Sequence, residues 1–213
     1  MPDQITPELL LSAYASGVFP MAESAGSKGM HWVDPQHRGI FDLDKFHISR
    51  SLSQRISQWN YTIRTNSDFA ATVTACANRP ETWINAEIFD LYQALHNMGY
   101  AHSLEVWEEG EMVGGVYGVT LGAAFFGESM FSRRTDASKV ALAWLVHRLR
   151  AGGFTLFDTQ FITPHLASLG AVEIPRNAYH KRLNTALSTP ASFDPRNYAP
   201  TPYLVRQRKT HTS

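Results

Sequence analysis

The sequence predicts an α/β protein of the α+β kind, in which helices pack on a mixed sheet. Between residues 101 and 126, short apolar runs alternate with turn residues, which is the pattern of an antiparallel meander. The apolar run 123–126 is followed, after a polar turn, by apolar residues at helical spacing from Ala137 to Leu149. A second apolar run, 154–157, comes next. The stretch therefore reads as strand, helix and strand.

Polar residues stand where these two runs end. Gly127 stops the first run and Glu128 follows at once, while the second run delivers Asp158 and Gln160. If the two strands lie side by side, the three side chains meet at neighbouring strand ends, which is where open sheets bind ligands. They form a candidate site; the alternative is that both carboxylates only tie down strand ends.

Caps and stops define the helices. Asp136 is expected to cap the helix after the first run by accepting from the amide of Ser138 or Lys139, and Gly152 is expected to end it. The other expected elements, in chain order, are a helix from Thr6 to Gly17, an extended segment at 18–21, a helix from Ser49 to Trp59, a strand at 61–64, a segment opened by Ser67 and Asp68, a helix at 86–98, a brief helix at 164–169, a strand at 172–174 and a helix at 177–187.

Composition limits the class of protein. The 213 residues are 44% hydrophobic, which suits one domain or a small domain packed on a larger one. No apolar run is long enough to cross a bilayer and no leader pattern is present, so we expect a cytoplasmic protein without a membrane partner. The single cysteine, Cys76, excludes an internal disulfide and a cysteine zinc site, and the nine histidines show no metal-ligand spacing.

The net charge of zero hides a segregation of charge. Residues 81–128 hold eight acidic side chains and no Lys or Arg, whereas residues 133–182 hold eight basic side chains against three acidic ones. One part of the surface can suit a polyanion and another a cationic partner. The alternative is that both segments are ordinary solvated faces.

A meander followed by a helix and a strand is also the pattern of acetyltransferases of the GNAT type. Those cofactor sites use a Gly-rich turn at the helix start, where bare amides hold a pyrophosphate. Here the turn is Ser132-Arg133-Arg134-Thr135-Asp136, without glycine. Acetyl-CoA is therefore not the expected donor, even if the fold is shared.

A set of short strings in one order carries a closer resemblance. The chain resembles the leucyl/phenylalanyl-tRNA–protein transferase family over about residues 5 to 185. One departure is His31-Trp32-Val33-Asp34-Pro35, where the family usually shows two adjacent tryptophans before a Ser-Pro. The strings are Ala13-Tyr14, Gly17 to Met21, Ser49-Arg50-Ser51, Thr82-Trp83-Ile84, Ala101-His102-Ser103, Val113 to Val119, Gly127 to Ser132, Ala137-Ser138-Lys139, Asp158-Thr159-Gln160 and Ser168 to Ala171.

The resemblance implies a function and an architecture. The implied activity is transfer of Leu or Phe, and less readily Met, from its tRNA to a protein whose first residue is Arg or Lys, which marks that protein for degradation by the N-end rule. No cofactor or metal is implied. The implied architecture is a small N-terminal domain, taken as residues 1–60, on a GNAT-like catalytic domain, residues 61–188, followed by an extended proline-rich tail, residues 189–213, partly disordered from 207.

The resemblance also assigns roles to residues. Asp158, acting through Gln160, would orient and deprotonate the attacking amine, and Glu128 would hold the cationic acceptor terminus. Trp32 and Trp83 would flank the terminal adenosine of the tRNA. An apolar socket for the aminoacyl side chain would be formed by Val116, Phe125, Leu142, Leu145 and Phe157. The candidates for binding the tRNA phosphates are Arg38, Arg50, Arg133, Arg134 and Lys139.

Two other functions remain open from the sequence. The first is an N-acyltransferase of GNAT fold that uses an acyl-CoA, against which the glycine-free turn argues. The second is a non-catalytic module whose acidic segment, residues 81–128, captures proteins with basic N-termini. Labelled leucyl-tRNA and an Arg-initiated peptide distinguish the three, since only the transferase lengthens the peptide by one residue.

Overall fold

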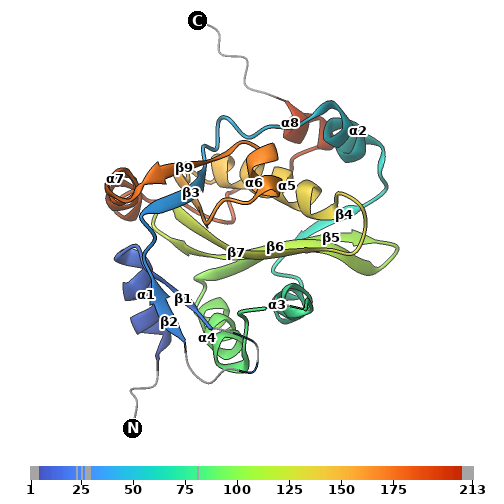
Figure 1. Ribbon diagram of the computed structural model, residues 1–213. Helices are drawn as coiled ribbons and strands as arrows, with labels where there is room; N and C mark the ends of the chain where they lie inside the picture. The colour runs from blue at the N-terminus through green and yellow to red at the C-terminus, as the bar shows by residue number, and fades with distance from the viewer. Residues whose placement is uncertain (1–4, 23, 25, 27–29, 81, 208–213) are drawn as a thin grey trace, which may run out of the picture.

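A central sheet of seven strands divides the protein into three layers (Figure 1). The computed structural model describes residues 5–22, 24, 26, 30–80 and 82–207. The strand order is β4-β5-β6-β7-β8-β3-β9, and every neighbouring pair is antiparallel except β7 and β8. The expected mixed sheet is therefore confirmed. The strands are β3 (His37–Phe41), β4 (Thr62–Thr65), β5 (Ala101–Glu108), β6 (Glu111–Leu121), β7 (Ala124–Ser132), β8 (Leu156–Gln160) and β9 (Ala171–Pro175).

Helices cover both faces of this sheet. Figure 1 shows α2 (Arg50–Gln58), α5 (Ala137–Ala151), α6 (Pro164–Ser168) and α8 (Pro202–Arg206) above it. Below it lie α1 (Pro7–Ala15), α3 (Phe69–Ala77) and α4 (Ala86–Asn97), and α7 (Arg176–Leu187) packs at the β9 end. Each face has its own apolar core. We call the one towards α1, α3, α4 and α7 the lower core, and the one towards α2 and α5 the upper core.

The N-terminal part follows the expected start signals. The side chain of Thr6 accepts from the amide of Leu9 and so caps α1, as predicted. The extended segment after Gly17 forms β1 (Phe19–Met21), which pairs antiparallel with β2 (His31–Val33). The chain between these strands lies partly outside the described residues. The domain division near residue 60 stays a prediction; β3, which precedes it, is a strand of the large sheet.

Two predictions about β7 and α5 are wrong. Gly127 does not stop the strand, because β7 continues to Ser132 and carries Glu128 inside it. Asp136 does not cap α5: its φ is +66°, and in this left-handed conformation its side chain makes no bond to a helix amide. Instead the hydroxyl of Ser132 accepts from the Ser138 amide, and Asp136 pairs with Lys139 at 2.8 Å.

The tail is more ordered than predicted. After α7 the chain returns over the upper core, where Phe193 and Val205 are buried. Thr201 caps α8, a short helix at Pro202–Arg206 that contacts α2 and α5. Two apolar anchors therefore hold a segment whose prolines indicated only an extended path. The predicted disorder from residue 207 falls almost wholly outside the described residues.

Candidate active site

The candidate site lies where the parallel strands β7 and β8 part. Their pairing covers only Ala124–Phe126 with Leu156–Asp158. Just beyond it, register shifts leave Glu128 on β7 and Thr159 on β8 without an opposite residue, and Gln160 adopts a φ of +63°. Such bulges bend a strand and redirect its side chains. The two bulges bring Glu128, Asp158 and Gln160 together, as the sequence predicted.

An apolar cavity opens at this parting. Its volume is about 80 Å³. Of the predicted socket residues, Val116, Leu142 and Phe157 line it, whereas Phe125 and Leu145 lie in the core without lining it. The sequence missed several lining residues, of which Phe41 packs against Phe157 with ring centroids 5.2 Å apart. The others missed are Gly127, Ser129, Met130, Thr159 and Leu166.

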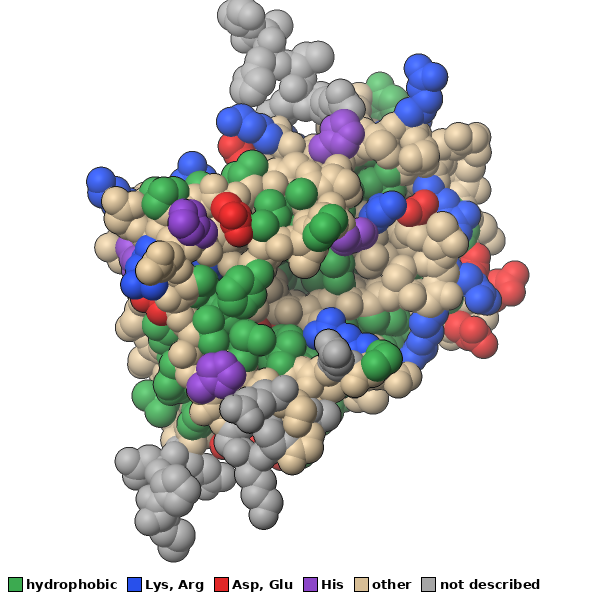
Figure 2. Space-filling model, viewed as in Figure 1, with side chains coloured by type: hydrophobic (Ala, Val, Ile, Leu, Met, Phe, Trp, Pro, Cys, Tyr) green, Lys and Arg blue, Asp and Glu red, His purple; other side chains and the backbone are tan. Residues whose placement is uncertain are grey.

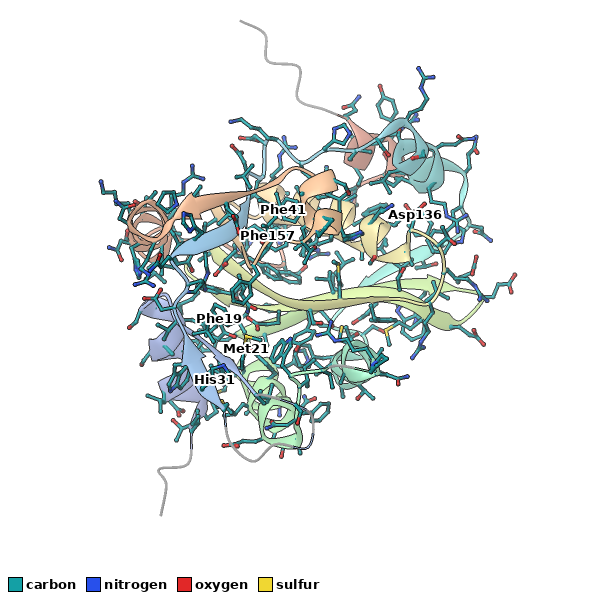
Figure 3. The ribbon with its side chains drawn as sticks, in the orientation of Figure 1. Phe19, Met21, His31, Phe41, Asp136 and Phe157 are labelled. Carbon is teal, nitrogen blue, oxygen red and sulfur yellow. The ribbon has the colours of Figure 1, made fainter. Side chains whose placement is uncertain are left out.

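The two sides of the site differ in character. Figure 3 shows Phe41 and Phe157 on the α5 side of the sheet, and Phe19, Met21 and His31 on the α1 side. Consecutive strand residues face opposite ways. Phe157 therefore joins the upper core, while its neighbour Asp158 faces the lower side with α1 and α7. Figure 2, seen from the same direction as Figure 1, shows a hollow near the middle of the visible surface, with hydrophobic side chains around it and basic side chains near it.

Glu128 is a buried residue among those that line the cavity, and its carboxylate is bound by α1 and α4. Tyr14 of α1 donates to its Oε1 at 2.7 Å, Tyr92 of α4 donates to its Oε2 at 2.7 Å, and the Gln160 amide donates to Oε2 at 2.9 Å. Burial raises the pKa of Glu128 to about 7, although the three donors oppose the shift. The carboxyl group therefore titrates near neutral pH.

Asp158 is fully buried and fully bonded. Arg38 donates to both of its oxygens, with Nη2 at 2.7 Å from Oδ2. The backbone N–H of Gln160 donates to Oδ1 at 2.7 Å, and the Tyr179 hydroxyl donates to Oδ2 at 2.8 Å. Asp158 thus holds the left-handed turn that directs the side chain of Gln160 to Glu128. Its geometry suits a positioning role.

The structure corrects the prediction for Arg38. Its side chain is only 1% exposed, and its Nη1 donates to the Gly17 carbonyl at 2.9 Å while its other nitrogens bind Asp158. The guanidinium lies 4.5 Å from the ring centroids of both Phe19 and Tyr179. With its donors occupied and its surface covered, Arg38 is not placed to bind a tRNA phosphate.

Three tyrosines of the site were not predicted as functional. Tyr14 and Tyr92 bind Glu128 and approach each other at 2.7 Å between hydroxyl oxygens, and Tyr179 binds Asp158. All three lie on the buried faces of helices. A buried tyrosine needs a partner for its hydroxyl, so their apolar surroundings were the only signal in the sequence.

Trp32 and His31 lie on β2, whereas Trp83 packs beside α4. Trp32 is 40% exposed on β2, and Trp83 lies edge-on to Tyr92 at 6.4 Å. His31 precedes Trp32 on the same strand, so the two side chains point to opposite faces. A second tryptophan at position 31 would therefore not extend the face that Trp32 presents. The role of both tryptophans at the adenosine stays a prediction.

The remaining basic candidates lie at the surface. Arg50 is exposed at the start of α2, and Arg133 and Arg134 are exposed in the turn before α5. Arg134 pairs with Glu108 at 3.2 Å, and half-buried Lys139 pairs with Asp136. A phosphate would have to replace these carboxylates as partners.

Comparison with known proteins decides the family. Residues 40–184 match the family described as leucyl/phenylalanyl-tRNA protein transferase, and residues 3–36 match the N-terminal domain of the same family. The chain belongs to this family. It is 66% identical to the leucyl/phenylalanyl-tRNA–protein transferase of Cereibacter sphaeroides over 212 residues, covering 100% of this chain and 99% of the relative. The predicted resemblance is thereby confirmed, and the protein is an aminoacyltransferase that uses aminoacyl-tRNA.

Two further relatives carry the same name. The enzyme of the same name from Ruegeria sp. is 61% identical, with 98% of this chain and 99% of the relative covered. That from Dinoroseobacter shibae is 54% identical, with 96% and 92% covered. Among solved structures, L-PGS from Bacillus licheniformis aligns with a TM-score of 0.42 at 18% identity, covering 78% of this chain and 56% of that one.

Metal and membrane features complete the description. In the described part of the chain, no three or more His, Cys, Asp or Glu residues gather as metal ligands. Over the same residues, no helix combines the length and apolar character that crossing a bilayer requires.

Proposed function

We propose that this enzyme transfers Leu or Phe, and less readily Met, from tRNA to the α-amino group of proteins that begin with Arg or Lys. The modified N-terminus would mark these proteins for degradation by the N-end rule, in the cytoplasm where aminoacyl-tRNA is made. One observation carries the proposal: an apolar cavity and a buried carboxylate, Glu128, meet where β7 and β8 part. A hydrophobic aminoacyl group suits the cavity, and a cationic amine suits the carboxylate.

The transfer reaction requires little from the enzyme beyond positioning the two substrates. The aminoacyl ester is already activated, and an amine held against it can react with an effective molarity of about 10⁵ M or more. In our proposal Glu128 holds the cationic terminus, Gln160 orients the amine, and Asp158 fixes Gln160 through the bond to its backbone amide at 2.7 Å. Trp32 and Trp83 would contact the terminal adenosine, since stacking contributes about 1–3 kcal/mol per base.

The start of α5 argues against an acyl-CoA donor. A pyrophosphate binds free amides at a helix N-terminus. Here the Ser132 hydroxyl already accepts from the Ser138 amide, and the Asp136 carboxylate stands at the helix start, paired with Lys139. An incoming pyrophosphate would meet a negative charge and an occupied amide.

A transfer assay tests the proposed function. Labelled leucyl-tRNA is incubated with a peptide that begins with Arg, with the same peptide acetylated at its N-terminus, and with an acyl-CoA in place of the tRNA. We expect the free peptide alone to gain one leucine, and only from the tRNA. An unchanged peptide mass with leucyl-tRNA, together with binding of the peptide, would favour a capture module instead.

The size of the cavity predicts a preference for Leu over Phe. On the measure that gives about 80 Å³, a water needs roughly 10–15 Å³, so the space suits roughly six water-sized atoms. The four carbons of a leucine side chain fit within this space with room to spare, whereas the seven carbons of a benzyl group fill it. Shortening Phe157 to leucine should raise kcat/KM for phenylalanyl-tRNA relative to leucyl-tRNA by about tenfold or more. Parallel assays with both tRNAs measure the ratio.

A neighbouring variant serves as the control. Phe125 packs edge-on against Phe157 at 5.2 Å but does not line the cavity. The change Phe125→Leu removes the same atoms from the same cluster, so it should lower stability without moving the ratio. An equal shift of the ratio in both variants would mean that general loosening, and not the lining, sets the preference.

Binding of the tRNA should depend steeply on salt. Each phosphate neutralised by Lys or Arg contributes about 0.7–0.9 to the slope of log affinity against log salt. We expect Arg133→Ala and Arg134→Ala to reduce that slope by about one unit each and to leave kcat unchanged at saturating tRNA. Filter binding across a salt series measures the slope.

The control for this prediction is Arg182→Ala. Arg182 is exposed on α7, which lies at the opposite end of the sheet from the turn before α5 (Figure 1). Its removal changes the net charge equally and should leave the slope as it is. If all three variants reduce the slope alike, the turn holds no specific phosphate contact.

A further inference from the structure

We propose that Glu128 is the group that takes the proton from the attacking amine, and that Tyr14 and Tyr92 position it in a closed ring of hydrogen bonds. The inference rests on the transfer reaction proposed above and adds a catalytic residue to it. Three contacts of 2.7 Å close the ring: Tyr14 to Oε1 of Glu128, Tyr92 to Oε2 of Glu128, and Tyr14 to Tyr92.

Counting protons shows that the ring has room for one more. Each tyrosine hydroxyl carries a single proton, and an ionised carboxylate carries none. With Glu128 ionised, two protons serve three short contacts between oxygens, and one contact lacks a proton. With Glu128 protonated on Oε1, each contact has one: Oε1 donates to Tyr14, Tyr14 to Tyr92, and Tyr92 to Oε2. The geometry is therefore complete only after a proton arrives.

The same geometry leaves one position open for the incoming amine. Oε2 accepts from both Tyr92 and Gln160, whereas Oε1 has only Tyr14 as a hydrogen-bond partner among the described residues. Glu128 also lines the apolar cavity. A carboxylate oxygen can accept more than one bond, so Oε1 has the capacity to receive an N–H of the attacking amine.

Asp158 is a weaker choice for this role. Its two oxygens already receive five contacts with donors, three of them from Arg38, and it is 0% exposed. A proton on Asp158 would break the ion pair with a buried guanidinium, which would then lack a counter-charge. A proton on Glu128 breaks no ion pair.

The surroundings of Glu128 support a carboxyl group that changes its charge near neutral pH. Burial raises its pKa to about 7, and the negative charge of Asp158 acts in the same direction, while the tyrosine hydroxyls and Gln160 lower it. No cation forms a salt bridge with it among the described residues; Arg38 is committed to Asp158. The titratable and charged groups that act on it are Tyr14 of α1, Tyr92 of α4, Tyr117 of β6, Arg38 of β3 and Asp158 of β8.

The proton balance of the reaction closes through this ring. The amine reacts in its neutral form: its lone pair attacks the ester carbon, the new C–N bond forms, and one N–H proton passes to Oε1 of Glu128. The C–O bond of the ester then breaks, and the ribose oxygen leaves as a hydroxyl by taking the proton back from the ring. Glu128 is ionised again at the end, and no other reactant is consumed.

The test is the pH profile of kcat/KM for transfer of leucine to an Arg-initiated peptide. Tyr92→Phe and Tyr14→Phe each remove one donor to the ionised carboxylate, so the pKa of Glu128 should rise. We expect the acid limb of the profile to move up by about one pH unit. The rate at pH 7 should fall about fivefold and return towards that of the parent at pH 9.

Tyr117→Phe is the matched control. Tyr117 is 0% exposed and packs against Tyr92 at 5.4 Å, but its hydroxyl has no hydrogen-bond partner among the described residues. The control loses the same atom from the same core and should keep the profile of the parent. A loss of rate at all pH values alike in Tyr92→Phe and Tyr14→Phe would mean only structural damage, and would overturn the proposal.

A measurement without turnover covers variants that fold poorly. Infrared difference spectra between the parent and Glu128→Gln should show the neutral carboxyl of Glu128 disappearing as the pH rises through about 7. A carboxyl that stays ionised from pH 5 to 9 would overturn the proposal even if transfer is observed. If the parent transfers no leucine at any pH, the proposed function itself fails.

Discussion

Arg38→Met is expected to lower the free energy of unfolding by about 3–5 kcal/mol, because removing one partner of a buried ion pair leaves the other charge uncompensated. Both side chains of the pair are almost fully covered, at 1% and 0% exposure. Methionine can fill the space between Phe19 and Tyr179, but it donates no hydrogen bond to Asp158 or to the Gly17 carbonyl. Urea unfolding of parent and variant at one pH measures the difference.

Two controls define what the loss means. Arg176 forms a similar pair with Asp34 at 3.2 Å, but it is 43% exposed, so Arg176→Met should cost about 1 kcal/mol or less. The double variant Arg38→Met with Asp158→Leu removes both charges and should recover part of the stability. A double variant less stable than Arg38→Met alone would show that packing, and not charge pairing, explains the loss.

The ion pair also explains why Arg38 was wrongly predicted from the sequence to bind a tRNA phosphate. The residue follows an exposed His37 and precedes Gly39, which is the composition of a surface turn. Its partner Asp158 lies 120 residues further along the chain, so no local pattern points to the contact. The one available signal was strand alternation, since Arg38 and Ile40 share a face and Ile40 belongs to the lower core.

Local rules predicted the elements well for a physical reason. Helix caps such as Thr6, Ser49 and Asp68 satisfy amides within their own turn, so three or four residues are enough to predict them. The prediction that Asp136 caps α5 was wrong because Asp136 itself adopts a left-handed conformation, which depends on how β7 and α5 are joined. The prediction that the strand ends at Gly127 was wrong because its pairing partners, and not the local composition, decide where a strand ends.

The sequence predicted the three polar residues at the strand ends, but not the tyrosines that bind them or the role of each residue. The order of two apolar runs places Glu128 and Asp158 at adjacent strands, and the structure confirms that they meet. The bulges at Glu128 and Thr159 depend on tertiary pairing, so the split of the site across two faces could not be predicted. The socket was only partly predicted for a similar reason. Leu142 lines the cavity and Leu145 is buried in the core, but nothing in the sequence distinguishes the two positions.

Glu128→Gln is expected to remove about 3–4 kcal/mol of the pH dependence of stability. The pKa of Glu128 is raised to about 7 by burial, from an ordinary value near 4.3. The folded state therefore binds this proton more tightly than the unfolded state does. The resulting stability is fully present below about pH 4.3 and is lost as the pH rises through about 7, at 1.36 kcal/mol per unit.

Comparison of unfolding curves isolates this contribution. Parent and Glu128→Gln are unfolded by urea at steps between pH 4.5 and 8, and the difference in free energy is plotted against pH. The parent should lose stability relative to the variant up to about pH 7, with no further change above it. Glu109→Gln, which removes a carboxylate from the exposed tip of the β5–β6 hairpin, should run parallel to the parent.

The same result bears on the role of the residue. If Glu128 served only to join β7 to α1 and α4, the protein would be most stable with Glu128 protonated and all three contacts of the ring hydrogen-bonded. Ionising Glu128 would then have no function. An enzyme whose nucleophile is an α-amine, with a pKa of about 8, needs Glu128 ionised so that it can accept a proton. The enzyme therefore works at a pH where the folded state has lost the stability that protonated Glu128 provides. Curves that stay parallel for parent and Glu128→Gln would remove both the stability cost and the proton acceptor that it supports.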